Sequence, residues 1–232
     1  MHIKTLLAVL TLLAGCGGKA PEQMLTDSTA DAPSADPTPA PQETGDLPSQ
    51  CGSLAPLLRV LPVTKTVNGL PERYRTCESG EYAVMVGYYD EGEHASEYQF
   101  RVQLLRGDSP YAEGAVNPPG ATDEQRAFMR EAVTRIGDMV HTQWGLCRNH
   151  ATNPSIPDGR NPTLASIKGV EVCFSDNLDA DKSVWHAKAV QNNLSFELEL
   201  TGAKAAAMLT TVEAQAHLAP LFETFLLDEA AQ

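Results

Sequence analysis

The chain has 232 residues, and its 17 basic and 30 acidic side chains give a net charge of −13. This acidic excess argues against nucleic acid as a partner, because the protein would repel the phosphates. Hydrophobic residues make up 42% of the chain, which is typical of a globular domain that carries some disordered length. The only strongly apolar stretch, residues 5–15, is too short for a transmembrane helix. We therefore expect neither a nucleic-acid-binding protein nor an integral membrane protein.

The N-terminus has the three-part pattern of an export signal. A short cationic start is followed by the apolar run Leu6–Leu13 and then by small residues. The last four residues of this pattern, Leu13-Ala14-Gly15-Cys16, resemble the lipobox of bacterial lipoproteins. The resemblance covers residues 1–16 alone. It implies that residues 1–15 are removed as a signal peptide and that the thiol of Cys16 carries the lipid. An ordinary secretory signal with an unrelated cysteine is the alternative.

The same resemblance implies a location in the bacterial cell envelope. Each buried methylene of an acyl chain contributes ~0.8 kcal/mol, so two or three chains hold a domain durably on a bilayer. Enterobacterial lipoproteins that stay at the inner membrane carry aspartate after the lipidated cysteine, whereas this chain has Gly17. We therefore expect lipid anchoring, with the outer membrane favoured over the inner membrane.

Residues 16–50 have the composition of a tether. Residues 17–50 contain six prolines and six acidic residues, and no valine, isoleucine or aromatic residue. Such a segment cannot bury enough apolar area to offset the entropy lost on ordering, so we expect it to be disordered. The folded part should then be a single domain over residues 51–232.

This domain contains four cysteines, an even number that favours disulfides in an exported chain. Cys51 and Cys77 are 26 residues apart, and so are Cys147 and Cys173. The equal spacing predicts the local pairs Cys51–Cys77 and Cys147–Cys173, one in each half of the domain. The crossed pairing would close longer loops and gain only about 1 kcal/mol more for each disulfide, so loop entropy does not decide the connectivity.

Five segments of the domain have strand patterns. Apolar and polar side chains alternate in residues 98–104 and 194–200, as they do in a half-buried strand. Residues 191–193, Gln-Asn-Asn, predict a tight turn before the second of these segments. The other three predicted strands are residues 82–89, 170–174 and 184–190.

Two segments have helical patterns. Thr122 and Gln125 match a capping box, and apolar residues then recur at helical spacing until Gly145, which we expect at the position after the helix end. The C-terminal segment 203–229 is rich in alanine and leucine. Pro220 should interrupt it, which predicts two short helices or one kinked helix.

The elements together predict an α+β fold with an antiparallel sheet and helices packed on one face. A shift of 96 residues places Cys51 on Cys147 and residues 98–104 on residues 194–200 in phase. This match suggests two β-β-α pseudo-repeats, with halves 51–146 and 147–232. Coincidence among alternating strands is the alternative. The order of elements also resembles the PsbP-like α/β sandwich, although no motif supports that resemblance.

No catalytic constellation is visible in the sequence. The chain has no nucleophile elbow, Walker or Rossmann motif and no zinc-protease motif. The spacing of His141, Cys147 and His150 matches no zinc pattern, and the acidic residues 176–181 lack the glycine and distal glutamate of a calcium loop. We therefore nominate no catalytic residue, metal ligand or cofactor.

These observations lead to one leading expectation and one alternative. The leading expectation is a lipid-anchored envelope protein with a non-catalytic binding domain, such as an adaptor, an inhibitor or an immunity-type protein. Its partners would be the membrane, through the lipid, and another envelope protein. The alternative is an envelope hydrolase whose site is assembled from residues that are distant in sequence.

Overall fold

The computed structural model describes residues 50–92, 95–154, 160–176 and 184–227. The predicted signal peptide, Cys16 and nearly all of the predicted tether lie outside the described residues. Within the described ranges, no helix is both long enough and apolar enough to cross a membrane.

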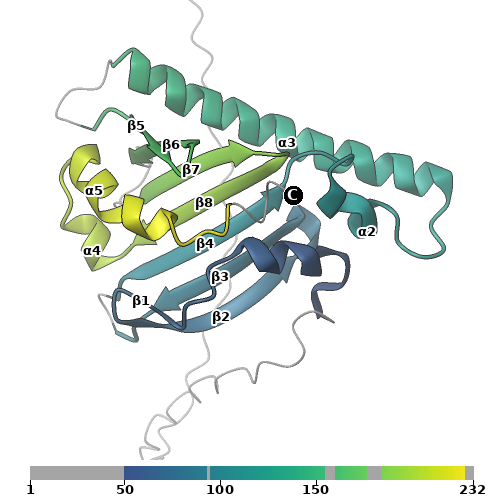
Figure 1. The fold of residues 1–232 in the computed structure, drawn as a ribbon, viewed down its shortest axis with the longest axis horizontal. Coiled ribbons are helices and arrows are strands. Elements are labelled where there is room, and N and C mark those ends of the chain that lie inside the picture. Colours follow the sequence, from purple (N-terminus) through teal and green to yellow (C-terminus); the bar gives the residue numbers. More distant parts are fainter. Residues whose placement is uncertain (1–49, 93–94, 155–159, 177–183, 228–232) are drawn as a thin grey trace, which may run out of the picture. The chain divides into compact units, whose positions relative to one another are not determined.

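A sheet of eight antiparallel strands organises the fold (Figure 1). Its strand order is β1-β2-β3-β4-β8-β7-β6-β5. The strands are β1 (Thr66–Val67), β2 (Leu70–Glu78), β3 (Ala83–Tyr89), β4 (Glu97–Leu104), β5 (Thr163–Ile167), β6 (Val170–Asp176), β7 (Trp185–Gln191) and β8 (Leu194–Thr201). The predicted α+β class with an antiparallel sheet is confirmed.

Each half of the chain contributes a four-stranded meander, β1 to β4 or β5 to β8. This count differs from the two strands of the predicted β-β-α unit. In the first hairpin of each half, β1, β2 and β5 are absent from the prediction, because β1 has two residues, β5 has five, and none of the three alternates apolar and polar residues over its length. Tight turns close these hairpins at Asn68-Gly69 and Lys168-Gly169, where both residues of each turn have positive φ.

The two meanders meet where β4 pairs with β8. In this antiparallel pairing Arg101 lies opposite Glu197, and these two residues are separated by the same 96 positions that separate Cys51 from Cys147. The shift that superimposes one half of the sequence on the other therefore also pairs the two central strands. This register is that of two halves related by an approximate two-fold axis through the Arg101–Glu197 pair.

One face of the sheet is apolar and carries the core. Short helices cover it: η1 (Gly52–Val60) contacts β3 and β4, and α5 (Thr211–Phe222) contacts β5, β6 and β7 (Figure 1). Phe225, just after α5, stacks edge-on against Phe100 of β4 at 5.3 Å and Phe196 of β8 at 5.5 Å between ring centroids. Both halves thus share one core.

The remaining short elements connect the larger ones. They are η2 (Ser79–Glu81), η3 (Pro110–Ala112), α2 (Glu113–Val116) and α4 (Ala203–Ala206). The C-terminal segment forms two short helices, as the sequence allowed, but the break does not lie at Pro220. Residues 207–210 separate α4 from α5, where Thr210 and Glu213 form a capping box that starts α5, and Pro220 is accommodated inside α5.

Helix α3 (Asp123–Thr152) differs most from its predicted form. The capping box of Thr122 and Gln125 is present, but the helix continues through Gly145 to Thr152. Its last turns are attached to β6, by the disulfide of Cys147 and by an Arg148–Glu171 ion pair of 2.9 Å. These contacts favour continuation of the helix. The prediction that Gly145 follows the helix end is therefore wrong.

The position of α3 also refines the expected layer order. The side chain of Cys173 lies opposite Lys188, Lys188 opposite Glu197, and Glu197 opposite Arg101, so all four project from the face opposite the core. Since α3 is bonded to Cys173, it lies against this second face, and it runs across the strand ends (Figure 1). Only the short helices lie on the apolar face.

Both predicted disulfides are present. Cys51 joins Cys77 of β2 with Cα atoms 5.3 Å apart, and Cys147 joins Cys173 of β6 with Cα atoms 6.3 Å apart. Each bond attaches the helix that precedes a meander to the second strand of that meander. The equal spacing in the sequence thus reflects an equivalent role in the two halves.

Candidate functional site

The face of the sheet opposite the core carries the most unusual chemistry of the described residues. We call it the polar face and define it by the side chains that project from the central strands away from the core: Glu97, Gln99 and Arg101 of β4, His186 and Lys188 of β7, and Glu197 and Glu199 of β8. The strict alternation of β4 and β8 produces it, because every second residue must project away from the buried side chains.

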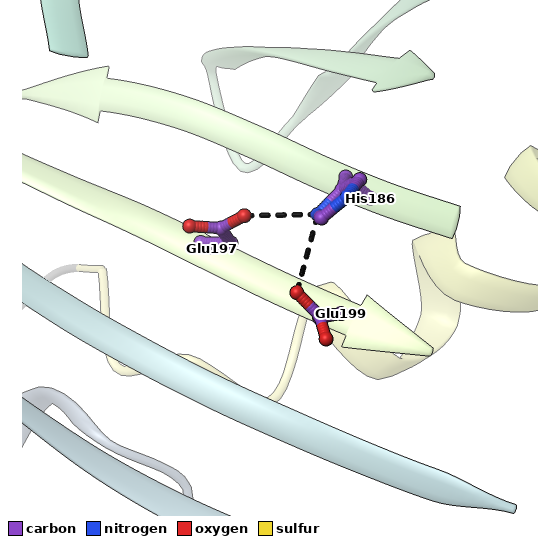
Figure 2. A group of neighbouring side chains, drawn as sticks. All are labelled: His186, Glu197 and Glu199. Carbon is purple, nitrogen blue, oxygen red and sulfur yellow. Dashed lines mark hydrogen bonds and ion pairs between the residues drawn. The ribbon is translucent and has the colours of Figure 1, made fainter. Parts of the chain in front are cut away.

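Three of these residues form a compact cluster (Figure 2). His186 lies opposite Glu199 in the β7–β8 pairing, and Glu197 lies two residues before Glu199 on the same face. The imidazole Nδ1 of His186 is 2.9 Å from Oε1 of Glu197 and 3.7 Å from Oε2 of Glu199. We call these three residues the histidine–glutamate cluster.

The two carboxyl groups of the cluster have opposite pKa shifts. Burial opposes ionisation of Glu197, but the hydrogen bond from His186 and the charge of Lys188, whose Nζ lies 2.9 Å from Oε1, outweigh it and lower the pKa to about 2. Burial raises the pKa of Glu199, and the negative charge of Glu197 adds to that effect. A further positive charge would therefore stabilise the ionised form of Glu199 more than that of Glu197.

A second group of polar contacts borders the cluster on β4. The hydroxyl of Tyr74 donates to Oε1 of Glu97 at 2.8 Å and accepts from Nε2 of Gln99 at 2.8 Å. The ring of Tyr74 lies over Gly87, where any Cβ atom would collide with it. The glycine therefore permits Tyr74 to reach across β3 to β4 and to hold Glu97 beside the cluster.

A groove separates α3 from the polar face. Its volume is about 320 Å³. The helix lines it with the mainly apolar residues Ile136, Met139, Val140, Gln143 and Trp144, and the sheet and η2 line it with the polar residues Glu81, Arg101, Gln103, Lys188, Ser195 and Glu197, together with Ala189 and Val190. Since Glu197 belongs to both, the groove and the histidine–glutamate cluster are continuous.

Two buried donors in this groove have no hydrogen-bond partner among the described residues. They are Nε of Arg101 and Nε1 of Trp144. The guanidinium of Arg101 is otherwise paired, with Glu81 and with Glu78 at 3.5 Å. An unpaired buried donor costs free energy, so the groove favours a ligand that carries acceptor oxygens next to apolar atoms.

Helix α3 leaves several apolar side chains uncovered, one of them at the groove. Only Val133 and Gly137 are fully buried in this helix, although the sequence predicts a continuous buried stripe. Met139 at the groove is 56% exposed, and Phe128 and Leu146 are also exposed. Such a row of exposed apolar residues on one helix is typical of a binding surface.

The two tryptophans of the chain lie in different environments. Trp144 lines the groove, whereas Trp185 is buried in the core and donates its Nε1–H to the carbonyl of Ala205 at 3.0 Å. Cys147 is in a disulfide and therefore unavailable as a thiolate ligand beside His141. Part of the acidic segment 176–181 lies outside the described ranges.

The cluster itself is missing from the sequence prediction. Its residues are separated by strand and turn positions, so no contiguous motif contains them. The alternation of residues 194–200 places Glu197 and Glu199 on one face, and the two-residue turn Asn192-Asn193 fixes the register that brings His186 opposite Glu199. Pairing this hairpin explicitly would have revealed the cluster.

Comparisons of the chain with protein-family models, with curated proteins and with solved structures gave no match. The groove, the histidine–glutamate cluster and the N-terminal sequence pattern are therefore the features that bear on function. Fold alone would not define an activity in any case, because one fold supports many functions.

Proposed function

We propose that this protein is a lipid-anchored component of the bacterial cell envelope whose domain binds another envelope protein. The lipid attachment rests on the resemblance of Leu13-Ala14-Gly15-Cys16 to a lipobox. The outer membrane is favoured because glycine rather than aspartate follows Cys16. Residues 17–50, acidic and rich in proline, would let the domain stand away from the lipid surface.

The binding role is supported by one structural observation above all. The groove beside α3 combines the exposed apolar side chain of Met139 with buried donors that have no partner among the described residues. Protein interfaces are enriched in methionine, aromatic residues and arginine, and both Trp144 and Arg101 line this groove. The partner should insert an apolar side chain against α3 and place carbonyl or carboxylate oxygens against the sheet.

Site-specific photo-crosslinking in the native envelope tests this role. A photoreactive phenylalanine analogue in place of Met139 should give one predominant protein adduct, identified by mass spectrometry. The matched control is the same replacement at Val63, which is also exposed but lies between η1 and β1, away from the groove. Identical adducts from both positions, or none from position 139, would contradict binding through the groove.

A hydrolase is the second candidate, and the histidine–glutamate cluster favours it. A histidine hydrogen-bonded to a carboxylate, as His186 is to Glu197, is a common arrangement for a general base. Turnover of fluorogenic ester, amide and phosphoester substrates should then require His186. Hydrolysis that is lost in His186→Asn but retained in the Val63 control variant would support the hydrolase. Absence of hydrolysis by the wild type, or equal rates with and without His186, would leave the binding role as the proposal.

A further inference from the structure

The histidine–glutamate cluster has the donor set of a metal site. The ligand atoms offered by His186, Glu197 and Glu199 all lie within 4.8 Å of one another. Zinc binds imidazole nitrogen and carboxylate oxygen at about 2.0–2.2 Å, which places neighbouring ligand atoms roughly 3–3.6 Å apart. The distances from Nδ1 of His186, 2.9 Å to Glu197 and 3.7 Å to Glu199, lie just below and just above that range.

The backbone holds these donors in place. His186 and Glu199 are directly opposite each other in the β7–β8 pairing, and both strands lie inside the sheet with a neighbour on each side. Figure 2 shows the imidazole of His186 directed from β7 toward the two carboxylates of β8. The histidine and Glu197 are largely shielded from solvent, with side-chain exposures of 12% and 23%. A cation would bind here with little rearrangement, because the strands already orient its ligands.

The charges around the cluster favour a cation. Glu197 and Glu199 provide two carboxylates, and Glu97 on the adjacent strand β4 acts on Glu199 as a third negative charge. Lys188 contributes one positive charge, through its contact with Glu197. The nearby guanidinium of Arg101 is paired with Glu78 and Glu81. These residues leave an excess of negative charge around Glu199, which a divalent cation would neutralise.

The mixture of donors indicates the class of ion. Calcium and magnesium prefer sites made only of oxygen, whereas an imidazole with carboxylates suits divalent transition metals. Three protein ligands also leave at least one coordination position for water or for a group of a ligand in the adjoining groove. We propose that His186, Glu197 and Glu199 bind a divalent transition-metal ion, with Zn²⁺ as the test ion.

Calorimetric titration of the full chain tests this site. The protein is produced without a polyhistidine tag, extracted in detergent, stripped with chelator and titrated with zinc chloride. We expect one tightly bound ion per chain, and at least tenfold weaker binding in Glu199→Gln. The matched control is Glu171→Gln, which makes the same change on the same sheet face. Glu171 pairs with Arg148 and lies on β6, a strand that contributes no residue to the cluster. That variant should bind zinc like the wild type.

A second readout separates loss of the site from loss of the fold. Cobalt(II) bound in the wild-type site should give the visible absorption bands of a cobalt ion with a nitrogen ligand. His186→Asn should remove these bands, while the circular dichroism spectrum of the variant stays native. Failure of the wild type to bind zinc, or zinc affinity that is unchanged in Glu199→Gln or His186→Asn, would overturn the proposal. Crosslinking at Met139 requires no metal. The metal site and partner binding through the groove can therefore be refuted independently of each other.

Discussion

Two glycines of α3 allow a sharp test of how this helix packs. Gly137 lies where α3 crosses the end of β4. An added Cβ there would collide with the carbonyl oxygen of Leu105 and would lie 2.7 Å from its carbonyl carbon and 2.9 Å from its Cα atom. Gly145 lies two turns further along, and an added Cβ there would have no atom within 4 Å. Replacement by alanine is therefore the same chemical change at both positions, but it creates a steric clash only at Gly137.

The expected effects differ in sign. Alanine in an exposed helix interior is favoured over glycine by about 1 kcal/mol, so Gly145→Ala should raise the free energy of unfolding by up to that amount. Gly137→Ala gains the same helix propensity but must displace backbone atoms of Leu105, and overpacking of this kind costs about 1–3 kcal/mol. Since backbone cannot rotate away as a side chain can, we expect a cost near the upper limit and a net destabilisation of about 2 kcal/mol.

Urea unfolding of both variants, monitored by far-ultraviolet circular dichroism, measures this difference. Tryptophan fluorescence is less suitable, because Trp144 lies next to Gly145. Equal stabilities of the two variants would refute the close approach of α3 to Leu105. A destabilised Gly145→Ala would show that this glycine needs a left-handed conformation, as the sequence prediction of a helix end at Gly145 implied.

Three further predictions concern one disulfide, the partly buried His217 and the lipid. Replacing both Cys147 and Cys173 by serine should lower the free energy of unfolding by ~3.5 kcal/mol by the loop-entropy relation; a change below about 1 kcal/mol in urea unfolding would contradict it. Burial lowers the pKa of His217 below its ordinary 6.5, so the unfolded chain binds the proton more readily. The neutral form of His217 therefore contributes its full stability above pH 6.5, and this contribution is lost as the pH falls through the folded pKa. His217→Gln should make the free energy of unfolding fall less steeply between pH 7 and 5. An unchanged slope of stability against pH would contradict this prediction. Cys16→Ser should abolish incorporation of labelled palmitate; a wild-type chain that incorporates none would remove the basis for the lipid anchor.

The sequence predicts most of the sheet because alternation is a local signal. Residues 98–104 and 194–200 show it clearly, and the structure places strands there as β4 and β8. Strands β1, β2 and β5 are absent from the prediction, because β1 and β5 are short and none of the three shows a clear alternation of apolar and polar residues. Pairing with neighbouring strands stabilises them, which is a tertiary effect that propensity does not contain.

The end of α3 shows the converse problem. Gly145 has the residue type and spacing of a helix terminus, yet the helix continues for seven residues, to Thr152. Its continuation depends on the bond between Cys147 and Cys173 and on the Arg148–Glu171 ion pair, both made to a strand more than twenty residues away in sequence. Local signals therefore mark where a helix can end, and tertiary contacts decide whether it does.

The candidate site was less predictable than the fold. Every residue of the histidine–glutamate cluster is also an ordinary outward-facing position of an amphipathic strand, so residue type alone does not distinguish it. Only the register of β7 against β8 brings His186 and Glu199 together. The groove depends in addition on the path of α3 over the polar face, which follows from the Cys147–Cys173 bond. The register of β7 against β8 could be derived from the hairpin turn, whereas the path of α3 requires coordinates.

The pairing at the centre of the sheet also bears on the ancestry of the chain. Two identical half-length chains could build the same eight-stranded sheet as a homodimer, with one β4-like strand from each subunit at the interface. In that dimer the residue on the two-fold axis would face its own copy, so an arginine there would oppose an arginine, which is unfavourable. If two such halves were joined in one gene, each could mutate separately. The position could then carry opposite charges, as Arg101 and Glu197 do in this chain.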